Sequence, residues 1–256
     1  MFFEVELFKV YLLVLVRVSG LIMTAPVLGS RNFPAMAKVG LAAFTALIIT
    51  PALPALAETL PDGALAFGVL SMGELAIGLM MGLVMQMVFA AVQVAGQIID
   101  MLSGFAMMNV FNPALETQVP IFGFFLYIIA ALYLLVWNGH HLMIRGLVST
   151  FDKIPLGGFA VQPGLLWEAS VWGRVMFLDG LAIAAPVAAS LLVAYVTMGL
   201  LGRVVPQIQL FVVGFPVTIA LGLLTVAFMM GIYLTILDGM FVRMFRNLET
   251  VVRGIT

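Results

Sequence analysis

Cysteine is absent from this chain of 256 residues, and histidine occurs only twice. Without cysteine the chain can form no disulfide, no thiolate nucleophile and no cysteine-ligated metal site. His140 and His141 are neighbours and would point about 100° apart on a helix, whereas a metal-binding pair on one helix face needs a spacing of three or four residues. Since no enzyme motif is visible either, we expect no metal, no cofactor and no enzyme activity.

Charged residues are also scarce. They make up 9% of the chain, against roughly 25% in soluble domains. Hydrophobic residues make up 64%, and the mean hydropathy is +1.21. Eleven basic and twelve acidic residues are too few to cover a 27.6 kDa globule in water, so the sequence indicates an integral membrane protein. The net charge of −1 argues against a nucleic-acid partner, which would need a basic surface.

What the chain does contain is long apolar runs, separated by charges and prolines. Because these runs are continuously apolar rather than alternating, they favour helices over the strands of a membrane barrel. We expect an all-α membrane protein with about six long apolar helices, a polar connection over residues 145–174 and a short basic tail after residue 242. The expected apolar segments are residues 5–28, 35–56, 65–100, 119–142, 175–202 and 206–242.

The third apolar segment carries a stripe of polar side chains that lie within about 20–40° of the direction of Gln86 on a helix. The stripe consists of Gln86, Gln93, Gln97 and Asp100. Amides in a bilayer need hydrogen-bond partners, so this face is expected to meet protein or water rather than lipid. Helix–helix hydrogen bonding inside a bundle and the lining of a pore both fit the stripe. Gly78 and Gly82 form a GxxxG pattern on the same segment, which is common in packed membrane helices.

A few charges lie within or near the apolar segments, where ionisable residues often mark functional sites. A proton relay and structurally paired charges are both consistent with them, and the sequence does not indicate which acid meets which base. They are Arg17, Glu74, Asp179, Arg203 and Asp238.

The connection over residues 103–115 is unusual because it joins two apolar segments and yet is itself apolar and bulky. Surface loops are normally polar, so an apolar loop is expected to be covered. Methionine and phenylalanine together adapt their shape to fill a gap, and a hydrophobic constriction closes a channel by dewetting. The sequence fits both a pore constriction and a re-entrant loop packed in the bundle. The bulky side chains are Phe105, Met107, Met108, Val110 and Phe111.

Several short motifs together resemble the FliR family of flagellar type III export-gate subunits, which has homologues in injectisomes. The most specific is the block from Pro206 to Pro216, PQIQLFVVGFP. The resemblance runs from the first segment to the last. The other motifs are QVAGQ at residues 93–97, GFA at 104–106, FNP at 111–113, NGH at 138–140 and FDKIPLG at 151–157.

The resemblance implies a kinked helical protein, present as one copy in a helical assembly with several copies of two smaller membrane subunits. Residues 1–174 would resemble one of these subunits and residues 175–256 the other. The loop 103–115 would be a plug in the central pore, with the polar stripe anchoring the helix that leads into it or lining the pore. Asn112 stands where many relatives are expected to have an acidic residue. The implied plug residues are Phe105, Met107, Met108, Val110, Phe111, Asn112 and Pro113.

The resemblance also implies partners and a location. The partners would be the two smaller gate subunits, a substrate-switch membrane protein, a large export-gate protein and unfolded flagellar substrates. Arg17, Glu74, Arg203, Gln207 and Asp238 are candidates for contacts between subunits. The location would be the bacterial inner membrane at the flagellar basal body, with part of the assembly above the membrane plane. The turn at Arg203 would then face the cytoplasm, whereas the distribution of Lys and Arg favours cytoplasmic termini and the opposite side for this turn.

The function expected on these grounds is that of a flagellar export-gate subunit that helps to form a gated pore for unfolded proteins. An injectisome gate subunit would share the fold and carry another cargo. A proton-coupled secondary transporter is the alternative from a different class. That class usually shows repeated halves with matching broken helices, and the sequence shows none.

Overall fold

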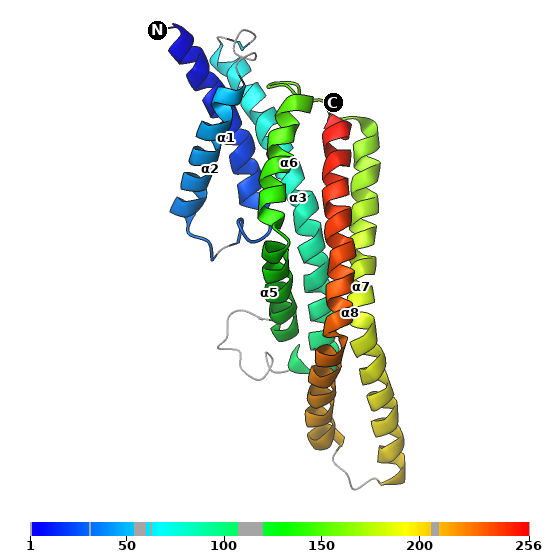
Figure 1. Cartoon of the computed structure of the whole chain (residues 1–256). Helices are drawn as coiled ribbons and strands as arrows, with labels where there is room; N and C mark the ends of the chain where they lie inside the picture. The colour runs from blue at the N-terminus through cyan, green and yellow to red at the C-terminus, as the bar shows by residue number, and fades with distance from the viewer. Residues whose placement is uncertain are drawn as a thin grey trace. The chain divides into compact units, whose positions relative to one another are not determined.

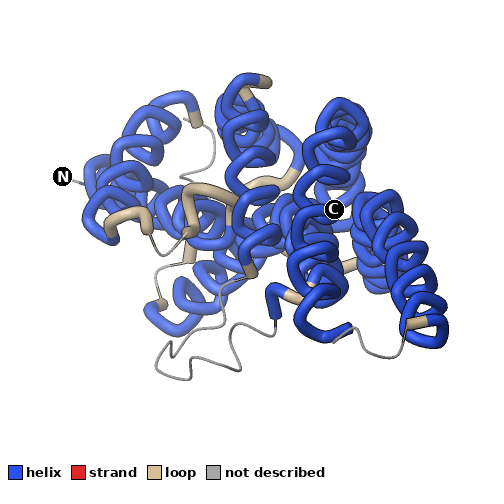
Figure 2. Tube along the Cα trace, turned by 90° about the horizontal axis from the view of Figure 1, so that it is seen from below, coloured by secondary structure: helices blue, strands red, loops and turns tan. Residues whose placement is uncertain are grey.

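A computed structural model describes residues 2–30, 32–53, 60–61, 63–106, 120–205 and 210–255 of the chain (Figure 1). Within these ranges the chain forms helices joined by short loops and contains no strand (Figure 2). The helices are α1 (Phe2–Thr24), α2 (Ala35–Ile49), the short 3-10 helix η1 (Thr50–Ala52), α3 (Ala64–Ser103), α5 (Ile121–Val136), α6 (Gly139–Lys153), α7 (Pro163–Val204) and α8 (Leu210–Ile255). The prediction of an all-α protein is confirmed.

The described residues contain five helices that are long and apolar enough to cross a membrane, or six if α5 and α6 are taken as one bent span. The chain bends by 66° at the break between these two helices. Asn138 lies at the break in the left-handed conformation, with φ at 55°. An asparagine tolerates this conformation better than most residues because its short polar side chain can hydrogen-bond locally. The expectation of about six apolar helices is therefore confirmed.

The ends of several helices differ from the predicted segments. The stretch 145–174, predicted as a polar connection, is largely helical, because α6 continues to Lys153 and α7 begins at Pro163. The residues predicted as a short basic tail also belong to a helix, since α8 continues without interruption to Ile255. These helix ends are amphipathic: Leu248 and Val252 are buried while Arg246 is exposed. A charge therefore marks one exposed face of such a helix rather than its end.

The chain forms two compact units, each assembled from separate stretches. Unit 1 contains residues 1–87, 133–172 and 243–256, and unit 2 contains residues 88–132 and 173–242. These units do not follow the expected division at residue 174, apart from the nearby boundary at 172. That division rests on resemblance to two smaller subunits rather than on contacts, so it stays a prediction.

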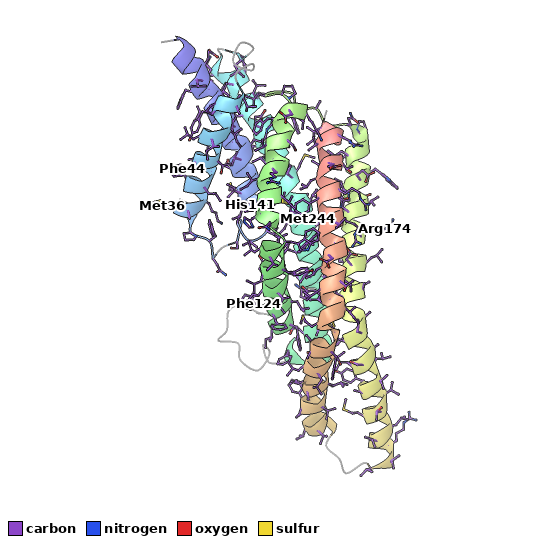
Figure 3. The ribbon with its side chains drawn as sticks, in the orientation of Figure 1. Met36, Phe44, Phe124, His141, Arg174 and Met244 are labelled. Carbon is purple, nitrogen blue, oxygen red and sulfur yellow. The ribbon has the colours of Figure 1, made fainter. Side chains whose placement is uncertain are left out.

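In unit 1, α1 and α3 approach each other through glycine. A Cβ atom added to Gly78 would lie 2.2 Å from the backbone oxygen of Arg17, and one added to Gly82 would lie 1.9 Å from Oγ1 of Thr24. The GxxxG pattern thus serves a helix contact inside the chain. Met244 of α8 is buried in this unit, whereas Met36 and Phe44 of α2 point away from the neighbouring helices and are 88% and 69% exposed (Figure 3).

In unit 2, α3 and α5 also meet at two glycines. A Cβ atom on Gly96 would lie 2.0 Å from Cα of Gly123. Nearby, the ring of Phe89 packs edge-on against Tyr127, with 5.5 Å between ring centroids. The hydroxyl of Tyr233 on α8 donates a 2.8 Å hydrogen bond to the backbone oxygen of Leu126 on α5. Backbone-to-backbone packing and one buried hydroxyl thus fix α5 in this unit.

Candidate functional site

The carboxylate of Asp100, one turn before the end of α3, caps the start of α5. Asp100 is 4% exposed, and its two oxygens accept hydrogen bonds from the backbone N–H groups of Phe122 at 3.1 Å and Gly123 at 3.2 Å. The first N–H groups of a helix have no acceptor within that helix. A carboxylate is well suited to them because it accepts hydrogen bonds at both oxygens and opposes the positive end of the helix dipole.

The last carbonyl groups of α3 are capped as well. Tyr195 on α7 donates a hydrogen bond of 2.6 Å to the backbone oxygen of Leu102, and Thr218 on α8 donates one of 3.0 Å to that of Ser103. These carbonyls have no N–H partner within the helix. We call this arrangement the α3 junction. It consists of the capping side chains of Asp100, Tyr195 and Thr218 and the backbone groups that they bind.

The chain leaves the α3 junction through Gly104. This residue has φ at +91°, a conformation that favours glycine just after a helix end. A Cβ atom there would lie 3.0 Å from the ring of Phe215 on α8. The next residue, Phe105, packs edge-on against Phe122 of α5, with 5.4 Å between ring centroids and 78° between ring planes. The first residues after α3 are therefore held against both α5 and α8.

Of the expected plug residues, only Phe105 lies in the described part of the chain, and it is half-buried at the α3 junction. The other six lie outside the described residues: Met107, Met108, Val110, Phe111, Asn112 and Pro113. Gln207, an expected subunit contact, also lies outside them.

The polar stripe lies on α3, and its members differ in exposure. Gln86 is half-buried, Gln93 and Gln97 are exposed, and Asp100 is buried at the α3 junction. Two amides are therefore presented outward from an otherwise apolar helix, one and two turns before the buried carboxylate. They are placed to meet water or another protein.

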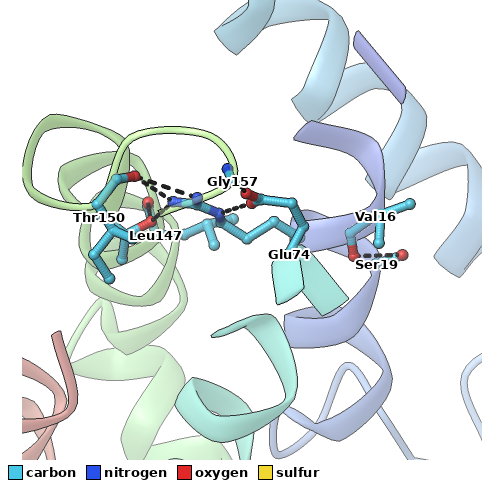
Figure 4. Close-up of polar contacts among 8 residues, drawn as sticks. Val16, Ser19, Glu74, Leu147, Thr150 and Gly157 are labelled. Carbon is cyan, nitrogen blue, oxygen red and sulfur yellow. Dashed lines mark hydrogen bonds and ion pairs between the residues drawn. The ribbon is translucent and has the colours of Figure 1, made fainter. Parts of the chain in front are cut away.

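The second polar cluster lies in unit 1 and is centred on Arg17 of α1. Its Nε donates a hydrogen bond of 2.5 Å to Oε2 of Glu74 on α3, and both side chains are 0% exposed. One guanidinium nitrogen lies 3.0 Å from Oγ1 of Thr150, and two lie 3.3 Å from the backbone oxygen of Ile154. The guanidinium also stacks 4.2 Å above the ring of Phe151. We call this arrangement the buried ion-pair cluster (Figure 4).

The buried ion-pair cluster continues into the connection between α6 and α7. The backbone N–H of Gly157 donates a 2.9 Å hydrogen bond to Oε1 of Glu74. A few residues on, Ala160 and Gln162 donate backbone hydrogen bonds of 3.2 and 3.0 Å to the oxygens of Ile255 and Gly254 at the end of α8. One short segment therefore joins the ion pair of α1 and α3 to the end of α8.

This geometry shows that Arg17 meets Glu74, one of the pairings of acid and base that the sequence left open. Arg17 and Glu74 were expected as subunit contacts, but in this structure each is fully enclosed by its own chain. Because no atom of either side chain can be reached from outside, we do not propose them as subunit contacts. Arg203 is exposed on α7, and Asp238 is half-buried on α8, so these two remain candidates.

Sequence reasoning missed the neutral partners of both clusters. Thr150 and Gly157 bind the ion pair, while Tyr195 and Thr218 cap α3. A hydroxyl on an apolar helix usually bonds to its own helix, so it gives no signal of a distant partner. Among the described residues, no group of three or more His, Asp or Glu side chains is arranged to hold a metal ion.

Comparison with known proteins identifies the family. Residues 8–244 match the family described as bacterial export proteins, family 1. The chain belongs to this family. The FliR resemblance expected from the motifs is confirmed across the chain. The α3 junction and the Arg17–Glu74 pair both fall within the matched residues, whereas the last turns of α8 lie beyond them.

Individual members of the family are similar to this chain over most of their length. It is 33% identical to the flagellar biosynthetic protein FliR of Escherichia coli (strain K12), over 95% of this chain and 93% of that protein. It is 32% identical to FliR of Bacillus subtilis (strain 168), over 97% of each chain. Identity to FliR of Caulobacter vibrioides is 29%, over 84% of this chain and 87% of that protein.

Proposed function

We propose that this chain is a subunit of the flagellar type III protein export gate, located in the bacterial inner membrane at the basal body. It forms, with partner subunits, a gated pore for unfolded flagellar proteins. Membership of the bacterial export family, similarity to FliR proteins over nearly the whole chain and five or six apolar helices support this function. The mechanism is physical rather than catalytic, and part of the assembly stands above the membrane plane.

The observation that carries the proposal is the outward position of Gln93 and Gln97 on α3. An amide that faces lipid lacks hydrogen-bond partners, so these two face a pore or another subunit. They are followed by Asp100 at the α3 junction and then by the apolar segment 103–115. A polar face that leads into an apolar constriction is the order of features that a gated channel needs.

In the resting state the apolar side chains of residues 105–111 close the pore by excluding water and therefore ions. Methionine adapts its shape to irregular gaps, so these side chains can seal without a rigid fit. An arriving unfolded chain displaces them, and partner proteins and the proton motive force supply the energy. The partners are two smaller gate subunits in several copies, a substrate-switch membrane protein and a large export-gate protein.

Deleting residues 105–113 is expected to leave a gate that leaks ions at rest, with conductance raised severalfold. The measurement is the conductance of membranes that contain this chain together with the two smaller subunits. A variant in which Gly and Ser replace the same nine residues separates the loss of apolar side chains from the shortening of the loop. The Thr235→Val variant is the control, because this exposed hydroxyl on α8 bonds within its own helix to Gly231.

The same preparation is weighed as an intact complex, and one copy of this chain with several copies of the smaller subunits is expected. Unchanged conductance in a deletion variant that still assembles would contradict the plug. If the chain instead ran as a monomer and left the smaller subunits behind, its place in a gate assembly would be wrong.

A further inference from the structure

The α3 junction caps two helix ends at once, and each cap comes from a distant part of the sequence. Asp100 reaches the start of α5 over a separation of 22 residues. The hydroxyls of Tyr195 and Thr218 reach the end of α3 over 93 and 115 residues. A local Ser, Thr or Asp would suffice to cap the start of a helix, and a local glycine to end one. Caps from other helices also fix where the helix ends lie.

Burial makes these caps more important than their number suggests. Asp100, Ser103 and Thr218 are all buried, so water does not reach the groups they satisfy, whereas the third cap, Tyr195, is 45% exposed. A backbone N–H or C=O that is buried without a partner is strongly unfavourable, most of all in a membrane. Loss of one cap would therefore cause the helix end to move until its backbone group forms another hydrogen bond.

The backbones around the α3 junction are packed too closely to slide. Gly96 and Gly123 bring α3 and α5 into direct backbone contact, which lets the short side chain of Asp100 reach the first turn of α5. On the other side, a Cβ atom built on Gly222 of α8 would lie 3.3 Å from Cβ of Ser103. Because even a single added carbon atom would meet Ser103 at this distance, little free volume is left for movement.

We propose that the α3 junction is a fixed anchor, and that Asp100, Tyr195 and Thr218 are positioning residues that keep the resting gate closed. They hold the end of α3 against α7 and α8 and the start of α5 against α3. The helix ends stay in place when a substrate passes. This inference rests on the proposed function, since it assigns a role in closing that gate.

The first test uses substitutions that remove a cap and keep the shape of the side chain. In Asp100→Asn, one of the two accepting oxygens becomes an NH₂ group that faces an N–H donor. Thr218→Val and Tyr195→Phe each remove a hydroxyl. We expect complexes that assemble and conduct severalfold more ions at rest than the unchanged protein. Thr197→Val and Thr235→Val are the matched controls, because both exposed hydroxyls bond within their own helices.

The second test fixes the junction covalently. Since the chain has no cysteine, Ser103→Cys combined with Gly222→Cys introduces a single pair. Its Cβ atoms would lie 3.3 Å apart, and a shift of a few tenths of an ångström brings them to the roughly 3.5–4.5 Å that a disulfide spans. In the Thr218→Val background, oxidation is expected to restore low resting conductance, and a reductant should reverse the effect. Oxidation of the pair in an otherwise unchanged chain should leave export of flagellar proteins intact. Each single-cysteine variant, treated with the same oxidant, controls for side reactions.

Several outcomes would overturn the inference. If oxidation blocks export and reduction restores it, the end of α3 must leave α8 during transport and is not a fixed anchor. If the cap variants only lower the amount of complex, with unchanged conductance per complex, the caps are structural and do not position the gate. Should Asp100→Asn fail to assemble, the two hydroxyl variants decide the question in the same way.

The inference and the proposed function fail in different ways. If deletion of residues 105–113 caused no ion leak, the proposed gate itself would be contradicted. Suppose instead that this deletion variant leaks ions, but all three cap variants have the same resting conductance as the control variants. The proposed gate would then stand, and only the proposed anchor would be contradicted.

Discussion

Replacing Arg17 by methionine is expected to lower the free energy of unfolding by about 3–5 kcal/mol, because it leaves the Glu74 carboxylate buried without its counter-charge. Glu74 is 0% exposed and would keep only the backbone N–H of Gly157 among the contacts described here. The guanidinium also supports Thr150 and the backbone oxygen of Ile154, so the loss extends to the end of α6. The measurement is unfolding of the purified chain in detergent by increasing amounts of SDS.

A double-mutant cycle separates the ion pair from the packing around it. Combining Arg17→Met with Glu74→Leu removes both charges, and the double variant is expected to be more stable than Arg17→Met alone. Glu6→Gln is the control on the same helix, since Glu6 and Lys9 form a partly exposed pair at 2.9 Å. Breaking such a pair should cost at most about 1 kcal/mol. If Arg17→Met and Glu6→Gln lowered the free energy of unfolding by equal amounts, the stabilising role of the buried ion-pair cluster would be contradicted.

Gly96→Ala is expected to destabilise unit 2 by about 3 kcal/mol or more, at or above the upper end of the usual cost of overpacking. The added Cβ would lie 2.0 Å from Cα and 2.5 Å from the backbone nitrogen of Gly123. Because these are backbone atoms, α3 and α5 must separate, and Asp100 then loses its reach to Phe122 and Gly123. Unfolding in SDS measures the loss of stability.

Gly199→Ala and Gly231→Ala are the matched controls for this prediction. Both glycines lie within apolar helices, and a Cβ atom at either would have no neighbour within 4 Å. In the isolated chain these substitutions should stabilise the helix by about 0.5–1 kcal/mol, because alanine is a better helix former than glycine. If Gly96→Ala had the same effect as the controls, the close approach of α3 and α5 would be wrong.

The helices could be predicted from the sequence because continuous apolar runs are their direct signature, but their ends could not. A charge predicts the end of a helix correctly where it coincides with a turn, as at the start of α3. It fails in α8, where Arg246 and Glu249 are exposed while Leu248 and Val251 are buried. There the charges lie on one side of a helix whose other side is covered, and only the fold shows which side that is.

The candidate site was predictable in a similar, partial way. Asp100 was found because it shares a helical periodicity with Gln93 and Gln97, and Arg17 because a charge in an apolar segment is rare. Their partners are backbone N–H groups and hydroxyls, which every helix carries and no pattern distinguishes. The distance in sequence adds to the difficulty: Thr150 lies 133 residues from Arg17, and Thr218 lies 115 residues from Ser103.

The way the two units are threaded sets an order for their assembly during synthesis. All residues of unit 2 precede residue 243, whereas unit 1 also needs residues 243–256. Gly254 and Ile255 accept hydrogen bonds from Gln162 and Ala160, which leave the ribosome much earlier. While the ribosome is still making α8, the Arg17–Glu74 pair can already form, but the segment beside it waits for its partner. Unit 1, which contains the first residues to be synthesised, is therefore completed after unit 2.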